Sequence, residues 1–287
     1  MQTKFIKSPL RYPGGKSRAI SFLKDFIPRD FIEYREPFFG GGSVGIYLTQ
    51  QALRSQTSQK KFFANDLNYE LFCFWEILKT QNKALINAIH NTKEQFKDGR
   101  ELYENILHRR NENLSPMQRA IDFFILNRIT FSGVVDSGGY SQKAFEARFT
   151  QSSIERLKNM DTILQHFIFS CEDYESLLQK EGEGVFIFLD PPYFSASKSK
   201  LYGKKGILHS AFNHQRLCEK LKNTKHQFLL TYDDSEFIRE LYKDFYLQEW
   251  SLQYGMNNFK QERASKGKEL LISNFELMKQ NQIFVSA

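Results

Sequence analysis

The chain has 287 residues, of which 41% are hydrophobic and 25% charged, an ordinary composition for a soluble globular protein. Its 40 Lys and Arg residues against 33 Asp and Glu residues leave a formal charge of +7, which favours a polyanionic partner but also occurs in generically basic proteins. Three widely spaced cysteines and no apolar stretch near about 18 residues argue against a disulfide framework, a zinc site and a membrane span, so we expect a soluble cytoplasmic protein.

Strand patterns lie toward both ends of the chain, and helical patterns fill the middle. Residues 34–48 predict a short strand, a glycine turn and a helix from about Ser43, and residues 60–66 predict a second strand. From residue 69 to about 165 the apolar residues recur at helical spacing, interrupted by a glycine-rich segment. Strand patterns then return at residues 166–173, 184–193, 226–234, 246–252 and 268–275.

Strands that alternate with helices predict an α/β fold, a Rossmann-like doubly wound and mainly parallel seven-stranded sheet. The helical block spans about a hundred residues, which is too long for a loop inside a compact domain. We therefore expect a discontinuous sheet domain, residues 1–68 and 167–287, with an inserted helical subdomain, residues 69–166.

The stretch EPFFGGGSVG, residues 36–45, joins a strand to a helix through three glycines. Such a turn is typical of nucleotide sites, where the backbone approaches the ligand closely, although a tight structural turn is the alternative. It is not a strict GxGxxG, and the segment Gly15-Lys16-Ser17 is no P-loop because Leu10 stands where the first glycine should be. Asp66 and Asp173 each end a strand, where a carboxylate can accept hydrogen bonds from ribose hydroxyls or cap a helix.

The apolar strand at residues 185–189 ends in the tetrapeptide Asp190-Pro191-Pro192-Tyr193. Prolines cannot continue the ladder, so the chain leaves the sheet here with a carboxylate, a stiff carbonyl and an aromatic ring. A carboxylate and a carbonyl can together accept both hydrogen bonds of one amino group, while the ring stacks on the base that carries it. A proline-stopped strand with a capping Asp is the alternative.

The order RYPGGK (residues 11–16), EPFFGGGS, ANDLN, helical block and FLDPPY resembles that of the Dam-like (D12 class) DNA adenine-N6 methyltransferases. The resemblance extends to ILNRITFSG at residues 125–133 and GKELLISNF at residues 267–275. It implies transfer of a methyl group from S-adenosyl-L-methionine to the N6 amino group of an adenine flipped out of double-stranded DNA, with no metal. It also implies a monomer in a bacterial, archaeal or phage-infected cell, with a separately encoded restriction endonuclease as a candidate partner.

Carried onto this chain, the family's motifs assign site residues. Asp190 and the Pro191 carbonyl would bind the target amino group beside Pro192, and Tyr193 would stack on the flipped adenine. The glycine turn would hold the methionine part of the cofactor, Asp66 the ribose and Asp173 the adenine. The full predicted cofactor set is Tyr12, Gly14, Gly15, Lys16, Pro37, Phe38, Phe39, Gly40, Gly41, Gly42, Asp66, Asp173, Tyr174 and Asp190.

DNA contacts are expected beside the RYPGGK element, in the helical insert and in the loop after Tyr193. The predicted residues are Arg11, Asn127, Arg128, Ser132, Ser137, Tyr140, Ser141, Lys198, Lys200 and Lys204. An internal salt bridge is the alternative for Arg128, and a merely solvated loop is the alternative for the lysines. Dam proteins that read GATC have YNGL after the Asn-Arg pair, whereas this chain has TFSGVVDSGGYSQ, so GATC is not assumed.

Two rival functions remain open from the sequence. The same amino-group chemistry serves methylation of cytosine, of RNA or of a protein amide. A catalytically silent DNA-binding protein on a methylase fold is the rival from another class. Methyl-acceptance assays with defined oligonucleotides separate these possibilities.

Overall fold

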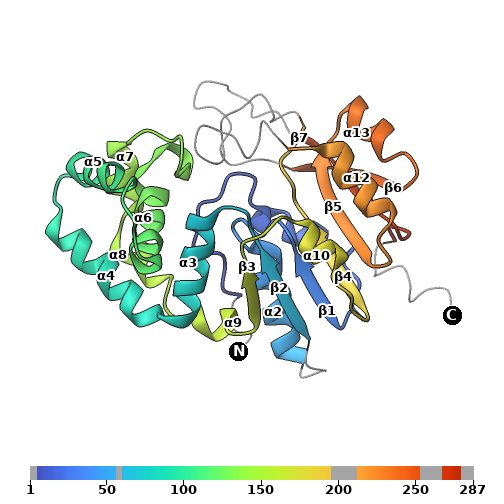
Figure 1. Ribbon diagram of the computed structural model, residues 1–287, viewed down its shortest axis with the longest axis horizontal. Coiled ribbons are helices and arrows are strands. Elements are labelled where there is room, and N and C mark those ends of the chain that lie inside the picture. The colour runs from blue at the N-terminus through green and yellow to red at the C-terminus, as the bar shows by residue number, and fades with distance from the viewer. Residues whose placement is uncertain (1–4, 56–59, 195–211, 253–266, 279–287) are drawn as a thin grey trace.

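The computed structural model describes residues 5–55, 60–194, 212–252 and 267–278. Within them seven strands form one sheet in the order β3-β2-β1-β4-β5-β7-β6 (Figure 1). The predicted α/β fold is therefore confirmed. The strands are β1 (Glu33–Glu36), β2 (Lys61–Asn65), β3 (Phe167–Ser170), β4 (Val185–Leu189), β5 (Gln227–Asp233), β6 (Tyr246–Leu252) and β7 (Gly267–Ser273).

The strand order produces a topological switch point between β1 and β4. Strands β1 and β4 pair in parallel. The sheet continues from β1 to β2 and β3 on one side and from β4 to β5 on the other. Strand β7 is antiparallel to its neighbours β5 and β6. In open parallel sheets ligands bind beyond the carboxyl ends of the strands at such a point.

Helices cover both faces of the sheet. Along β4 the side chains alternate, so that Phe186 and Phe188 pack in one apolar cluster and Ile187 and Leu189 in another. Burial on both faces explains why this strand is apolar at every position. The first cluster includes side chains of α1 (Ile20–Leu23) and α2 (Ser43–Ser55), which follow the 3₁₀ helix η1 (Lys16–Arg18); the second includes those of α10 (Glu175–Gln179), α12 (His214–Lys222) and α13 (Glu236–Leu241).

The helical block lies beside the β3 edge of the sheet (Figure 1). Its central helix, α6 (Pro116–Ile129), is buried from Ala120 to Ile129. It packs on the first helix of the block, α3 (Tyr69–Thr80), through the stacked rings of Phe74 and Phe124, whose centroids are 6.0 Å apart. Asn68 starts that first helix, because its side chain accepts hydrogen bonds from two backbone N–H groups of the first turn. The elements are α3 (Tyr69–Thr80), α4 (Asn82–Gln95), α5 (Gly99–Arg109), α6 (Pro116–Ile129), η2 (Phe131–Gly133), α7 (Gln142–Arg148), α8 (Gln151–Glu155) and α9 (Asp161–Leu164).

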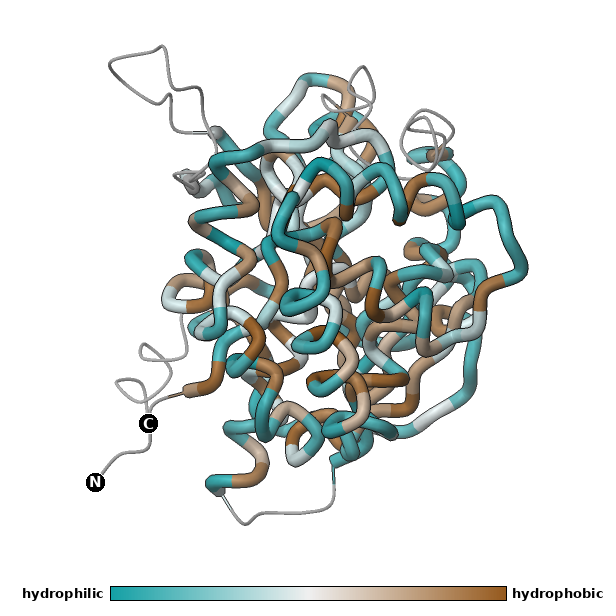
Figure 2. The backbone as a smooth tube through the Cα atoms, turned by 90° about the vertical axis from the view of Figure 1, so that its left-hand side faces the viewer, coloured by the Kyte–Doolittle hydropathy of each residue, from teal (hydrophilic) through white to brown (hydrophobic). Residues whose placement is uncertain are grey.

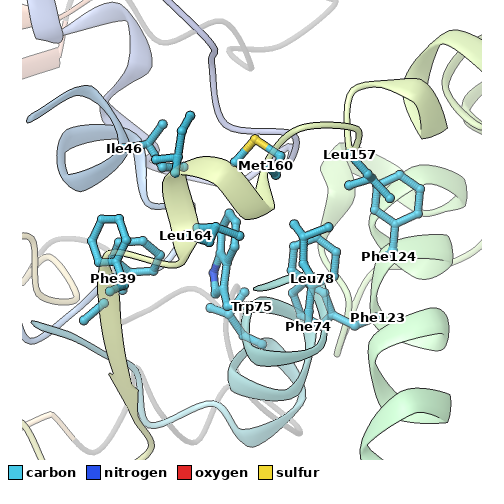
Figure 3. Packing of buried hydrophobic residues seen from close by; sticks show 14 of the residues in the cluster. Phe39, Ile46, Phe74, Trp75, Leu78, Phe123, Phe124, Leu157, Met160 and Leu164 are labelled. Atoms are coloured by element: carbon cyan, nitrogen blue, oxygen red, sulfur yellow. The ribbon is translucent and has the colours of Figure 1, made fainter. Parts of the chain in front are cut away.

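One apolar cluster joins the helical block to the sheet. Trp75 of α3 lies 5.3 Å from the ring of Phe39 and donates a hydrogen bond to the Gly40 carbonyl at 3.0 Å, close to Leu164 (Figure 3). In Figure 2 the hydrophobic segments run mostly through the interior and the hydrophilic ones along the periphery. No helix in the described ranges is both long enough and apolar enough to cross a bilayer.

Candidate active site

A cavity of about 660 Å³ opens at the switch point. Its walls come from the loops that follow β1, β2, β3 and β4, from residues 12–16, and from the start of α12. Every residue predicted for the cofactor and for catalysis lines this one cavity. The role of each residue stays a prediction. The volume is in the usual range for small-molecule sites.

The glycine turn needs glycine for conformational and for steric reasons. Gly40 and Gly42 have φ angles of 49° and 64°, in the left-handed region that favours glycine. A Cβ atom on Gly42 would lie 2.5 Å from Cζ of Phe39, and one on Gly40 would lie 2.8 Å from the ring of Tyr12. The Tyr12 ring therefore packs directly on the turn, which brings the N-terminal segment to the cavity.

Asp66 ties the end of β2 to the glycine turn. Its carboxylate accepts hydrogen bonds from the backbone N–H of Gly40 at 2.8 Å and of Asn68 at 3.0 Å. Burial raises the pKa of Asp66 to about 6, and the two backbone hydrogen bonds oppose that rise. The helix-capping alternative is wrong for this residue, because Asn68 caps α3.

The far end of the cavity has an aromatic wall. The rings of Phe38 and Tyr174 lie 5.3 Å apart, and Phe212 lies 5.7 Å from Phe38. Asp173 beside them is exposed and accepts hydrogen bonds from the Glu175 N–H at 3.0 Å and from Arg216 at 3.3 Å. The N-cap residue of α10 is Tyr174 and not Asp173, although the Asp173 carboxylate accepts a bond from the first turn, and its contact with the cofactor stays a prediction.

Asp190 points into the cavity and is held by a lysine. Lys16 Nζ lies 2.7 and 2.8 Å from the two carboxylate oxygens of Asp190 and 2.9 Å from the Gly14 carbonyl, and the Lys16 side chain is buried. The Thr231 hydroxyl also donates a hydrogen bond to Oδ1 of Asp190, at 2.7 Å. The Tyr193 ring follows at 5.1 Å from Lys16 Nζ. Asp190 therefore already accepts hydrogen bonds from Lys16 and Thr231, and the Lys16 ammonium group balances its negative charge.

Carboxylates predominate around this pair. Glu36 is buried behind the glycine turn and accepts hydrogen bonds from the Tyr34 hydroxyl at 2.8 Å and the Gly45 N–H at 3.0 Å. Burial raises the pKa of Glu36, and the charges of Asp190 and Asp66 raise it further. Five acidic residues line the whole cavity against one lysine and one arginine, so an excess of negative charge remains with Glu36 neutral, and this excess favours a cationic ligand.

Two predicted DNA contacts prove to be internal. Asn127 is fully buried, and its amide accepts a hydrogen bond from the Arg11 N–H and donates to the carbonyls of Arg11 and Gly133. Arg128 is 2% exposed and donates a hydrogen bond to the Pro9 carbonyl. Burial, with nearby arginines, lowers its pKa to about 9. Both side chains hold the N-terminal segment on α6, so the prediction that they reach DNA is wrong; the salt-bridge alternative for Arg128 also has no acidic partner in the described ranges.

The other predicted contacts divide between structural and exposed positions. Ser141 caps α7, and Tyr140 is buried with its hydroxyl on Gln142, so neither presents a free polar group to DNA. Ser132 and Ser137 are exposed on the loop closed by the Thr130–Tyr140 bridge, and Ser132 also lines the cavity. Arg11 is half-buried, whereas Lys198, Lys200 and Lys204 lie outside the described residues.

Sequence reasoning missed several residues of the site. Phe212 lies just before α12 and Arg216 in its first turn. The sequence there matches no known motif, so no local signal marks these residues. Glu269 could have been noticed as an acid in the apolar strand GKELLISNF, and Thr231 as a hydroxyl in the apolar run of β5. Both contact the Asp190-Pro191-Pro192-Tyr193 loop across the sheet.

A doubly wound sheet with its ligand cavity at the switch point places the protein among the Rossmann-like enzymes. Within that class the chain belongs to the D12 class N6 adenine-specific DNA methyltransferases, the family that residues 12–256 match. The inferred family is thereby confirmed.

Curated relatives agree with this assignment. The type II methyltransferase M1.LlaDCHI of Lactococcus lactis subsp. cremoris is 24% identical over 92% of this chain and 94% of its own length. The type II methyltransferase M.MjaIII of Methanocaldococcus jannaschii is 25% identical over 69% of this chain and 72% of its own length. A DNA adenine methylase of Vibrio cholerae is 26% identical over 64% of each chain.

Proposed function

We propose that this enzyme moves a methyl group from S-adenosyl-L-methionine to N6 of an adenine flipped out of double-stranded DNA. The observation that carries the proposal is the position of Asp190 in the same cavity as the glycine turn and Asp66. The bound cofactor would supply an activated methyl group on a sulfonium, so no covalent enzyme intermediate is needed. The protein must then hold the acceptor nitrogen in line and make it more reactive.

The cavity suits the cofactor in charge and in shape. The carboxylates around the glycine turn favour a positive sulfonium, and each oxygen of Asp66 retains a lone pair that can accept from a ribose hydroxyl. The wall of Phe38, Tyr174 and Phe212 offers apolar faces for an adenine ring. We propose that Asp173 contacts the amino group of that ring.

Asp190 would act as a hydrogen-bond acceptor. Its charge is balanced by Lys16, which favours acceptance of a hydrogen bond over removal of a proton before transfer. The target amino group would donate one N–H to a carboxylate oxygen, which can accept two bonds, and the other to the Pro191 carbonyl. Once methylated, the nitrogen loses a proton to Asp190 or to water. Tyr193 would stack on the extruded base, whose unstacking costs a few kcal/mol.

The exposed loop around Ser132 and Ser137 is the DNA-facing element that we propose, together with Arg11 and with Lys198, Lys200 and Lys204. We also propose a monomer that acts in the cytoplasm beside a separately encoded restriction endonuclease, because two relatives are named type II methyltransferases.

The test is transfer of tritium-labelled methyl groups to defined duplexes. The purified protein should label duplexes that contain adenine in its recognition sequence, and digestion should yield N6-methyladenine. Sequencing that detects modified bases in DNA from cells expressing the chain would give the site. Label in cytosine, or binding of DNA without any transfer, would instead favour one of the two rival functions.

A further inference from the structure

Glu269 is an acid buried inside an apolar strand. It lies in β7, where it pairs in register with Asp233 of β5 and Trp250 of β6, and it is 1% exposed. Its Oε2 accepts a hydrogen bond from the Tyr193 hydroxyl at 2.9 Å. The carboxyl group therefore reaches the catalytic loop from two strands away in the sheet.

The paired acid Asp233 holds the next residue of the same loop. Its Oδ1 accepts a hydrogen bond from the Phe194 N–H at 2.8 Å, and the Phe194 ring stacks on Phe237 at 4.4 Å. Burying a carboxylate is costly, and an apolar side chain at position 269 would extend the run formed by the following residues of β7 at lower cost. Folding alone gives no reason for an acid at this position, whereas control of the loop does.

We propose that Glu269 is a positioning residue for methyl transfer, which fixes the Tyr193 ring through its hydroxyl and thereby aligns the stacked base with Asp190. The inference rests on the proposed function. The hydroxyl lies on the long axis of the ring, so this hydrogen bond fixes the direction in which the side chain points, while packing against the Tyr232 ring, 5.9 Å away, limits rotation about that axis. Even a small displacement of the reacting group lowers the rate of transfer strongly.

The charge state of Glu269 should tune this contact. The groups that face it are Lys16 from η1, Asp190 and Tyr193 from the loop, and Asp233 from β5. Burial raises the pKa of Glu269 to about 7, the charges of Asp190 and Asp233 act in the same direction, and Lys16 and the Tyr193 hydroxyl oppose them. The ionised form accepts the stronger hydrogen bond, so the ring is held more firmly above this pKa than below it.

The experiment measures kcat against pH at saturating cofactor and DNA for the wild type and for Glu269→Gln. The wild-type kcat should rise with pH through an inflection near 7, whereas the variant should show no such rise and fall about tenfold below the wild type at pH 8. Cofactor affinity should not change. In a cycle with Tyr193→Phe, the double variant should be no slower than the slower single variant.

A matched control is Glu33→Gln. Glu33 is another buried acid, but it lies at the amino end of β1, away from the cavity, and pairs with Arg35 at 2.6 Å. The substitution should lower the melting temperature and leave the pH inflection in place. A second readout needs no turnover: the ring resonance of labelled Tyr193 should titrate near pH 7 in the wild type and stay constant in Glu269→Gln.

A Glu269→Gln enzyme with wild-type kcat and inflection, or with losses that multiply with those of Tyr193→Phe, would overturn the positioning role. Failure of the proposed function looks different. The wild type itself would then transfer no methyl group to adenine, while the Tyr193 resonance still titrated with Glu269, and the positioning role would fall with the reaction.

Discussion

Lys16 and Asp190 form an ion pair at the centre of the proposed active site. The ammonium lies within hydrogen-bond distance of both carboxylate oxygens, and the residues are 174 positions apart in the chain. The RYPGGK segment and the Asp190-Pro191-Pro192-Tyr193 loop therefore line the same cavity. Their contact brings residues 11–16, which belong to no strand, to the carboxyl end of β4.

Replacing Asp190 should separate binding from chemistry. Asp190→Asn keeps the shape of the side chain but removes its charge, so the target amino group loses a strong acceptor and Lys16 loses its partner. We expect methyl transfer to fall at least about a hundredfold. Calorimetric titration should find that cofactor affinity falls far less than the rate of methyl transfer. Weaker cofactor binding with normal turnover at saturation would contradict the assigned role.

Asp66 should make cofactor binding depend on pH. Its pKa is raised to about 6, and the ionised form is the one that accepts hydrogen bonds from ribose hydroxyls. The affinity for S-adenosyl-L-methionine should therefore be constant above pH 7 and decline, by up to about tenfold per pH unit, as the pH falls through and below 6. Asp66→Asn should bind weakly at every pH, and a wild-type profile that is flat down to pH 5 would rule this role out.

Among the elements, the glycine turn after β1 has the narrowest tolerance. Gly42→Ala would put a methyl group 2.5 Å from the Phe39 ring at a positive φ angle. We expect a loss of about 1–3 kcal/mol in the free energy of unfolding, measured by denaturant titration.

The control for that substitution is Gly139→Ala. A Cβ atom there would meet its nearest neighbour, Phe131, at 4.0 Å. This variant should stay within about 0.5 kcal/mol of the wild type. Equal effects at the two glycines would mean that the turn does not require its special conformation.

Helix α6 shows why motif matches can mislead about side chains. Asn127 and Arg128 fall in the segment that resembles the family, yet both are buried and hold residues 9–11 in place. The helical spacing of ILNRI correctly predicts a helix, but it does not tell which face turns inward. That choice was made by α3, whose rings cover one side of α6, and by the N-terminal segment, which covers another.

At the scale of the whole molecule, the helical block and the sheet share one apolar cluster. The predicted sheet domain and inserted subdomain are separate segments of the sequence. In the folded chain, however, the contact between Trp75 and Phe39 joins them. Such a junction couples their stabilities.

Unfolding should therefore be a single cooperative transition. Thermal melts followed by far-ultraviolet circular dichroism and by tryptophan fluorescence should coincide, because the two buried tryptophans report on the junction (Trp75) and on the sheet (Trp250). Trp75→Phe should lower the midpoint without splitting the transition. Two resolved transitions would show that the helical block folds as a unit of its own.

Local patterns were sufficient for the elements and for most of the cavity lining. Alternation and helical spacing locate the strands and helices, since these periodicities arise from burying one or two faces. The residues after β1, β2, β3 and β4 gather because parallel strands all end at the same edge. The motifs placed there, from the glycine turn to Tyr193, could therefore be predicted together.

Contacts between distant segments lay beyond those patterns. The pairing of Lys16 with Asp190, the acid Glu269 under Tyr193 and the burial of Asn127 all depend on side chains brought together across strands and helices. A periodic pattern reports which face of an element is buried and carries no information on the partner that buries it. Packing in three dimensions supplied those partners, and with them the roles of these residues.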